Sequence, residues 1–175
     1  ELLDKLLTCT PELFGQFSND VERAKKILRS QAFYDIDQLE WATNCLHQVM
    51  TLISLGYYPA QICFPPIETD IVYKPFMSSE IIESLDDDQI NIYRDVYAML
   101  IRPVMERDRP AMVGISVVQQ KQLIPTFTFC KMIKEEFPET HITLGGNIIT
   151  RIRDMLPGME NLWEMFDSAI VYEGE

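Results

Sequence analysis

The sequence predicts an α/β protein whose last third forms a parallel βαβαβ sheet. An apolar run, Ala111–Ile115, ends at Ser116 and is followed by a helical pattern. A second β-rich run, His141–Leu144, stops at Gly145-Gly146-Asn147, and Ala169–Tyr172 is a third. Strand, helix and strand in this order are typical of a parallel βαβ unit. A large helical part is expected before the sheet.

The first 108 residues are predicted to be mostly helical. Ser18 or Asn19 is a candidate N-cap for the first helix. Apolar residues at helical spacing from Leu39 to Ile53 predict a long second helix, capped by Asp35 or Asp37 and ended near Gly56. The prolines of residues 57–76 forbid a helix there and predict an extended arm.

Two further helices are expected before the sheet. Ser78-Ser79-Glu80 begins a short one, and Asp86-Asp87-Asp88 begins the helix Ile90–Met105. Three adjacent aspartates can bind a metal ion, but acidic residues at a helix start also cap free N–H groups and stabilise the helix dipole. We favour the capping role. The predicted domains are therefore a helical region, residues 1–108, and a sheet domain, residues 109–175.

The sheet domain follows a regular order of elements. The strand Ala111–Ser116 is almost entirely apolar, which predicts that both of its faces are covered. The next helix begins after Lys121 and ends at Pro138, because the residue before a proline disfavours helix. Another helix is predicted from Asn147 or Thr150 toward Leu156, and Pro157-Gly158 is expected to end it.

Composition excludes several classes of partner. The net charge of -12 over 175 residues repels phosphate backbones and anionic membranes, so we expect no nucleic-acid partner and no membrane partner. No apolar run approaches the ~18 residues of a membrane span. The four cysteines are too far apart for a zinc or iron–sulfur motif. Cys45 and Cys130 lie among apolar residues at helical spacing, which favours reduced core thiols of a cytoplasmic protein.

The candidate binding residues follow the predicted strands, because ligands of parallel sheets bind beyond the carboxyl ends of the strands. The Ser116 hydroxyl and the N–H groups after it are suited to an anion or a ring amide, and Gln119 and Gln120 add uncharged donors and acceptors. Gly145-Gly146 allows a positive φ or a close approach to a ligand. A polar loop and a tight strand-to-helix turn are the structural alternatives for the same residues.

We assign no catalytic residue and no metal ligand. The G-x-S-x-G, H-E-x-x-H and G-x-G-x-x-G motifs are absent from the sequence. His47 lies beside helical core positions, and His141 has no Cys or carboxylate at ligand spacing. Glu173 and Glu175 flank Gly174 just after the last strand, where they form either a plain turn or acceptors for sugar and amide groups.

The order of these segments resembles the cobalamin-binding domain of B12-dependent radical SAM enzymes. The matching segments are Val113–Ser116 with Gln119, Leu144–Asn147, and Asp167 followed by Glu173-Gly174-Glu175. The resemblance covers residues 109–175 and implies a Rossmann-like (flavodoxin-like) sheet that holds cobalamin along its C-terminal edge. By analogy, the cofactor-binding residues are Ser116, Val117, Gln119, Gln120, Gly145, Gly146, Asn147, Glu173 and Gly174.

The resemblance also implies what lies outside this chain. In that family a radical SAM barrel follows, and it carries CxxxCxxC for a [4Fe–4S] cluster and binds S-adenosylmethionine. The chain begins with Glu and ends with Tyr-Glu-Gly-Glu, so we expect a fragment of a methyltransferase or tailoring enzyme that is not catalytic by itself. The D-x-H-x-x-G motif is absent, so any cobalamin would bind without a His ligand. The family's first strand, which ends in Pro-Pro, has its nearest counterpart in Ile62–Pro66.

Two other functions compete with this one. The same fold without a cofactor would be a scaffold or interaction domain, and the Tyr- and Met-rich helix Ile90–Met105 would then mediate docking or homo-oligomerisation. A stand-alone flavodoxin-like enzyme is disfavoured, because the sequence lacks a nucleophile motif, metal ligands and a phosphate loop.

Overall fold

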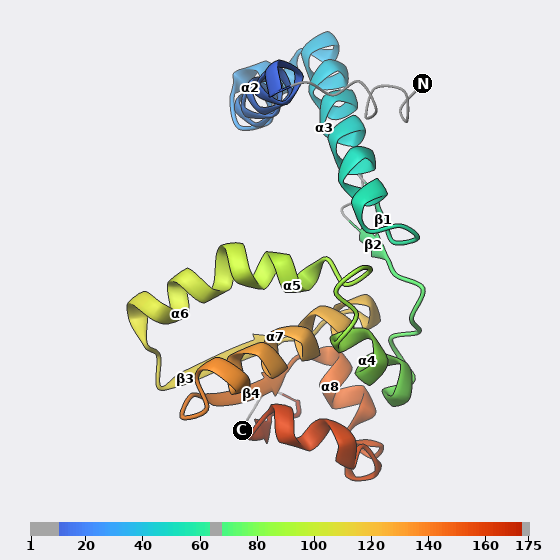
Figure 1. The fold of residues 1–175 in the computed structure, drawn as a ribbon, viewed down its shortest axis with the longest axis vertical. Coiled ribbons are helices and arrows are strands. Elements are labelled where there is room, and N and C mark those ends of the chain that lie inside the picture. The colour runs from blue at the N-terminus through green and yellow to red at the C-terminus, as the bar shows by residue number, and fades with distance from the viewer. Residues whose placement is uncertain (1–10, 64–67, 173–175) are drawn as a thin grey trace. The chain divides into compact units, whose positions relative to one another are not determined.

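The computed structural model describes residues 11–63 and 68–172. The chain divides into two compact units, Glu1–Asp70 and Ile71–Glu175 (Figure 1). The predicted boundary after residue 108 differs from this division, because α4 (Ser78–Leu85) and α5 (Tyr93–Val96) pack against α7 (Leu123–Glu136) of the sheet region. Within the described residues, every helix lacks the length or the apolar character needed to cross a membrane.

The first unit is a pair of helices followed by a short hairpin. Its elements are α2 (Pro11–Leu28), η1 (Gln31–Tyr34), α3 (Ile36–Gly56), β1 (Gln61–Cys63) and β2 (Glu68–Asp70), with β1 and β2 antiparallel. Ala24 and Ile27 of α2 pack against Ala42 and Leu46 of α3.

The predicted ends of these helices were partly right. Asp35 caps α3, since its Oδ1 accepts hydrogen bonds from the backbone N–H groups of Asp37 and Gln38 at 3.1 and 3.2 Å. The prediction that Ser18 or Asn19 begins the first helix was wrong. That helix begins at Pro11, a residue that the first helical turn tolerates because its missing N–H has no partner there.

In the second unit, the helices before the sheet are α4, α5, the π-helical turn η2 (Tyr97–Ile101) and α6 (Arg102–Asp108). The prediction that Asp86–Asp88 begins a helix was wrong, because α5 begins at Tyr93. Asp87 closes a turn instead: its Oδ1 accepts from the N–H groups of Gln89 and Ile90, both at 3.0 Å, and its Oδ2 accepts from the Tyr73 hydroxyl at 2.7 Å. These hydrogen bonds give the carboxylate a local structural role.

The sheet contains β3 (Met112–Ser116), β4 (His141–Gly145) and β5 (Ser168–Ala169) in that order, with both pairs parallel. The predicted parallel βαβαβ order is therefore confirmed. The third strand is shorter than predicted and begins one residue earlier. Between β4 and β5 the chain forms α8 (Asn147–Ile152), η4 (Leu156–Gly158) and η5 (Glu160–Met165).

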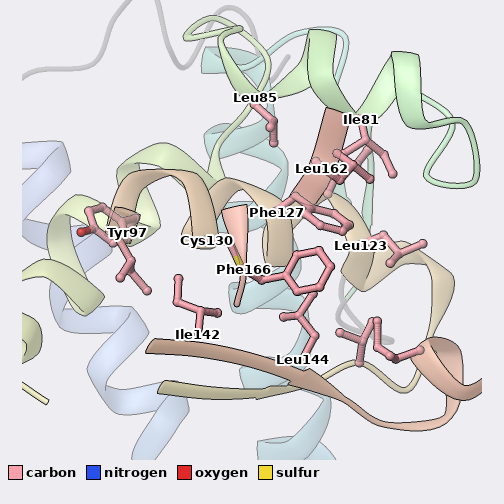
Figure 2. Packing of buried hydrophobic residues seen from close by; sticks show 14 of the residues in the cluster. Ile81, Leu85, Tyr97, Leu123, Phe127, Cys130, Ile142, Leu144, Leu162 and Phe166 are labelled. Carbon is pink, nitrogen blue, oxygen red and sulfur yellow. The ribbon is translucent and has the colours of Figure 1, made fainter. Parts of the chain in front are cut away.

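The core lies on one face of this sheet. Ile142 and Leu144 of β4 are fully buried and belong to the same cluster as Phe127 and Cys130 of α7 and Phe166. Figure 2 shows these side chains together on one side of the strands.

The prediction that β3 is covered on both faces was wrong. Val113 and Ile115 are half-buried, whereas Met112, Gly114 and Ser116 alternate with them and are exposed. The strand β3 lies at an edge of the sheet, and the core packs against one face of the sheet. An apolar run alone does not show which of its side chains face solvent in such a position.

Candidate functional site

The structure brings the ends of β3 and β4 together. Ser116 lies opposite Gly145 in the parallel register. The chain remains joined beyond the strands, because the Val117 N–H donates to the Gly145 carbonyl at 2.8 Å and the Ile148 N–H donates to the Val117 carbonyl at 3.0 Å. The two segments predicted to share one edge of a sheet therefore do so, and α8 begins directly at that edge.

Gly146 is the residue that permits this junction. Its φ is +96°, a value that L side chains rarely adopt. A Cβ atom there would lie 3.0 Å from the Ser116 Oγ and still closer to the backbone of Val117. The predicted close approach to a glycine backbone is thus found at Gly146. The group that approaches it is the chain at the end of β3, not a ligand. Gly145 differs, since a Cβ atom there would make ordinary contacts with Ile170 at 3.8 Å.

The other predicted residues divide into buried and exposed groups. Val117 is fully buried and packs in the core, so its side chain supports the edge without facing solvent. Ser116, Gln119, Gln120 and Asn147 are exposed. The exposed members carry a hydroxyl and three amides, and they form an uncharged, hydrogen-bonding rim. Glu173 and Gly174 lie outside the described residues.

The Gln122 side chain accepts hydrogen bonds from backbone N–H groups that were expected to bind a ligand. Its side-chain Oε1 accepts from the N–H groups of Val118 at 2.8 Å and Gln119 at 3.0 Å. The loop after Ser116 is therefore fixed from within the chain, which leaves side chains rather than these two amides to contact a ligand. The sequence signal was a Gln three residues after Gln119, the spacing of a capping box.

Asp167 lies away from this edge. Its Oδ2 is 2.6 Å from the Lys134 ammonium and accepts from the Ile142 N–H at 2.6 Å. The hydrogen bond from Lys134 lowers the pKa of the Asp167 carboxyl most, followed by the hydrogen bond from the Ile142 N–H and then by the charge of Lys134. Because Asp167 directly precedes β5 and Ile142 is near the start of β4, this carboxylate joins the amino ends of two strands.

A cavity of about 200 Å³ lies beside the same edge, on the helical side of the sheet. Gln120 and Leu123 line it from the start of α7, Ile148 and Arg151 line it from α8, and Phe127 forms part of its buried wall. Sequence reasoning identified Gln120 but missed Arg151, whose position depends on how α7 and α8 pack.

The chemistry of the site is that of hydrogen bonding and apolar contact. Within the part of the chain that the structure describes, no group of three or more His, Cys, Asp or Glu side chains could hold a metal ion. Burial raises the pKa of the Cys130 thiol to about 12, so this core cysteine is not a nucleophile at neutral pH.

No protein-family model, curated protein or solved structure matches this chain.

Proposed function

We propose that this chain is a cofactor-binding module, specifically the Rossmann-like, cobalamin-binding-like domain of a radical SAM methyltransferase or tailoring enzyme. The observation that carries the proposal is the juxtaposition of Ser116 and Gly145 at the carboxyl ends of adjacent parallel strands. Parallel sheets bind ligands at this edge. The chain would hold the cofactor and leave catalysis to a barrel elsewhere in the whole protein.

The rim chemistry supports a large amide-rich ligand. Cobalamin carries amide groups around its corrin ring, and the exposed side chains of Ser116, Gln119 and Asn147 offer uncharged donors and acceptors to such groups. The cavity of about 200 Å³ is too small for a corrin, so the ring would lie over the edge. Cobalamin would be held without a His ligand, and when bound it would supply methyl-transfer chemistry.

The proposal also includes a cytoplasmic location for the chain and two further cofactors in the barrel. Cys45, Cys63 and Cys130 are free thiols, which suits a reducing cytoplasm. The [4Fe–4S] cluster and S-adenosylmethionine would belong to the barrel, the intramolecular partner of this domain.

Mixing the chain with hydroxocobalamin, desalting the mixture and recording the visible spectrum tests the proposal. We expect corrin absorbance to co-elute with the protein. The double variant S116A/N147A should lose most of that absorbance, whereas N161A, an exposed Asn in η5, should retain it. Protein that elutes without corrin, or equal retention by both variants, would contradict the proposal.

An interaction domain is the second candidate, and one surface favours it. Met99 and Leu100 of η2 and Val104 of α6 are 74%, 62% and 44% exposed, an unusual density of apolar side chains on one helical segment. If this surface mediates self-association, light scattering should show a mass that increases with concentration. The substitution Leu100→Lys should then restore the monomer mass. A monomer at all concentrations would exclude homo-oligomerisation through this surface.

A further inference from the structure

We propose that the cavity between α7 and α8 binds a small apolar carboxylate, with a ring or branched hydrocarbon in the cavity and its carboxylate on Arg151. This inference concerns the helical side of the sheet edge and goes beyond the proposed cobalamin function. It depends on the shape of the cavity, on the charge at its rim and on the acidity of the chain.

The wall of the cavity is apolar. Leu123 and Phe127 of α7, Ile148 of α8 and Leu162 of η5 line it and are all at most 5% exposed. Met155 and Met159 also line it, together with Pro75, Phe76, Ile81 and Ile152. Methionine side chains adapt to irregular apolar groups, so this part of the wall can adjust to a ligand. A volume of about 200 Å³ is below the range typical of drug-sized sites and suits a fragment of one ring or a short branched chain.

Arg151 supplies the charge. Within the described residues its guanidinium makes no hydrogen bond, ion pair or ring contact. Arg153, two residues later, is already engaged: it pairs with Asp154 at 3.4 Å, contacts the Tyr172 hydroxyl and lies over the Tyr172 ring. An unpaired guanidinium is notable in a chain with a net charge of -12, where carboxylates greatly outnumber cations.

The apolar wall of the cavity and the charge of Arg151 together favour one class of ligand. A guanidinium binds carboxylates through paired, charge-assisted hydrogen bonds, and it disfavours amines by repulsion. Gln120, which also lines the cavity, adds an uncharged amide that can donate to the same group. An apolar cavity with one cation and one amide therefore fits a hydrophobic monocarboxylate better than a neutral hydrocarbon or a polar metabolite.

Methyl NMR with 3-phenylpropionate as the probe tests the inference. The whole chain carries nine methionines, and ¹³C-methyl labelling makes Met155 and Met159 direct reporters, with the exposed Met99 of η2 as an internal reference. We expect saturable shifts at Met155 and Met159 and none at Met99. The matched neutral amide, 3-phenylpropionamide, should bind about tenfold more weakly, since it lacks the charge.

Two variants on α8 provide the control. R151Q should reduce the affinity for the carboxylate to that for the amide, whereas R153Q, which removes the same charge two residues away, should leave both affinities unchanged. The ligand-free spectra establish that both variants are folded. The inference is overturned by the absence of saturable shifts at Met155 and Met159, by equal affinity for acid and amide, or by equal effects of the two variants. The assay contains no corrin, so its outcome is separate from that of the cobalamin experiment.

Discussion

Gly146 and Val117 lie so close that a Cβ atom on Gly146 would be 2.6 Å from the Val117 carbonyl oxygen and 2.8 Å from its amide nitrogen. The same Val117 N–H and carbonyl join the ends of β3 and β4 through hydrogen bonds to Gly145 and Ile148. The edge that we propose as a ligand site thus depends on the close contact between the backbones of Gly146 and Val117. That contact leaves no room for a side chain at residue 146.

The substitution Gly146→Ala should destabilise the sheet unit by about 3 kcal/mol, because it combines a positive φ with a backbone clash. Gly145→Ala should cost less than about 1 kcal/mol, since its Cβ atom has room. Urea unfolding followed by Trp163 fluorescence in a Trp41→Phe background measures this unit separately, because Trp41 lies in the other unit. Similar losses for both alanines would contradict the described junction.

The Asp167 carboxylate should make stability depend on pH. Its folded-state pKa lies below the ordinary 3.8, mainly because of Lys134, so folding favours the ionised form. Its contribution is therefore fully present above pH 3.8 and is lost as the pH falls through the lowered folded pKa. Urea unfolding of the chain and of Asp167→Asn from pH 6 downward should show a difference that shrinks below pH 3.8. A difference that stays constant across this range would disprove the linkage.

Asn91 should be intolerant of a carboxylate. It is 1% exposed, and its Nδ2 donates to the Ser84 carbonyl at 2.8 Å and to the Thr128 Oγ1 at 2.9 Å. In Asn91→Asp these donors disappear and a buried charge faces a carbonyl oxygen, which should cost about 3 kcal/mol. The matched change Asn161→Asp, at an exposed position, should leave urea unfolding nearly unchanged. Comparable losses at both sites would show that Asn91 is not buried in this network.

Cys130 should resist alkylation in the native state. Burial raises its pKa to about 12, so at pH 8 almost no thiolate is present, and the thiol is also inaccessible. Iodoacetamide labelling followed by peptide mass spectrometry should modify Cys63, which is partly exposed, well before Cys130. In urea the two should react alike. Equal native rates would place Cys130 outside the core.

The parallel order of the sheet could be predicted from sequence because it follows from local patterns. Ser116 and Gly145 each end an apolar run, and the intervening helix forces a parallel crossover. Asp35 was predictable for the same reason, since an N-cap acts within three residues of the backbone it caps.

Other features depend on packing between distant segments and left no local signal. The apolar run of β3 is compatible with either a central or an edge strand, so the exposure of Met112 depends on strand order. Asn91 contacts Thr128, 37 residues away, and Arg151 borders a cavity formed by several elements. An acidic run such as Asp86–Asp88 is compatible with a helix start and with a turn. The hydrogen bonds that Asp87 accepts show that it forms a turn here.

The most direct test of the proposed ligand edge is a titration of the ¹⁵N-labelled chain with hydroxocobalamin, followed by amide NMR. We expect saturable shifts at residues 116–120 and 145–148, and none at Ala111, Thr140 or Asp167, which lie by the amino ends of the strands. Absence of saturable binding, or shifts concentrated at those amino ends, would contradict the assignment of this edge to cobalamin.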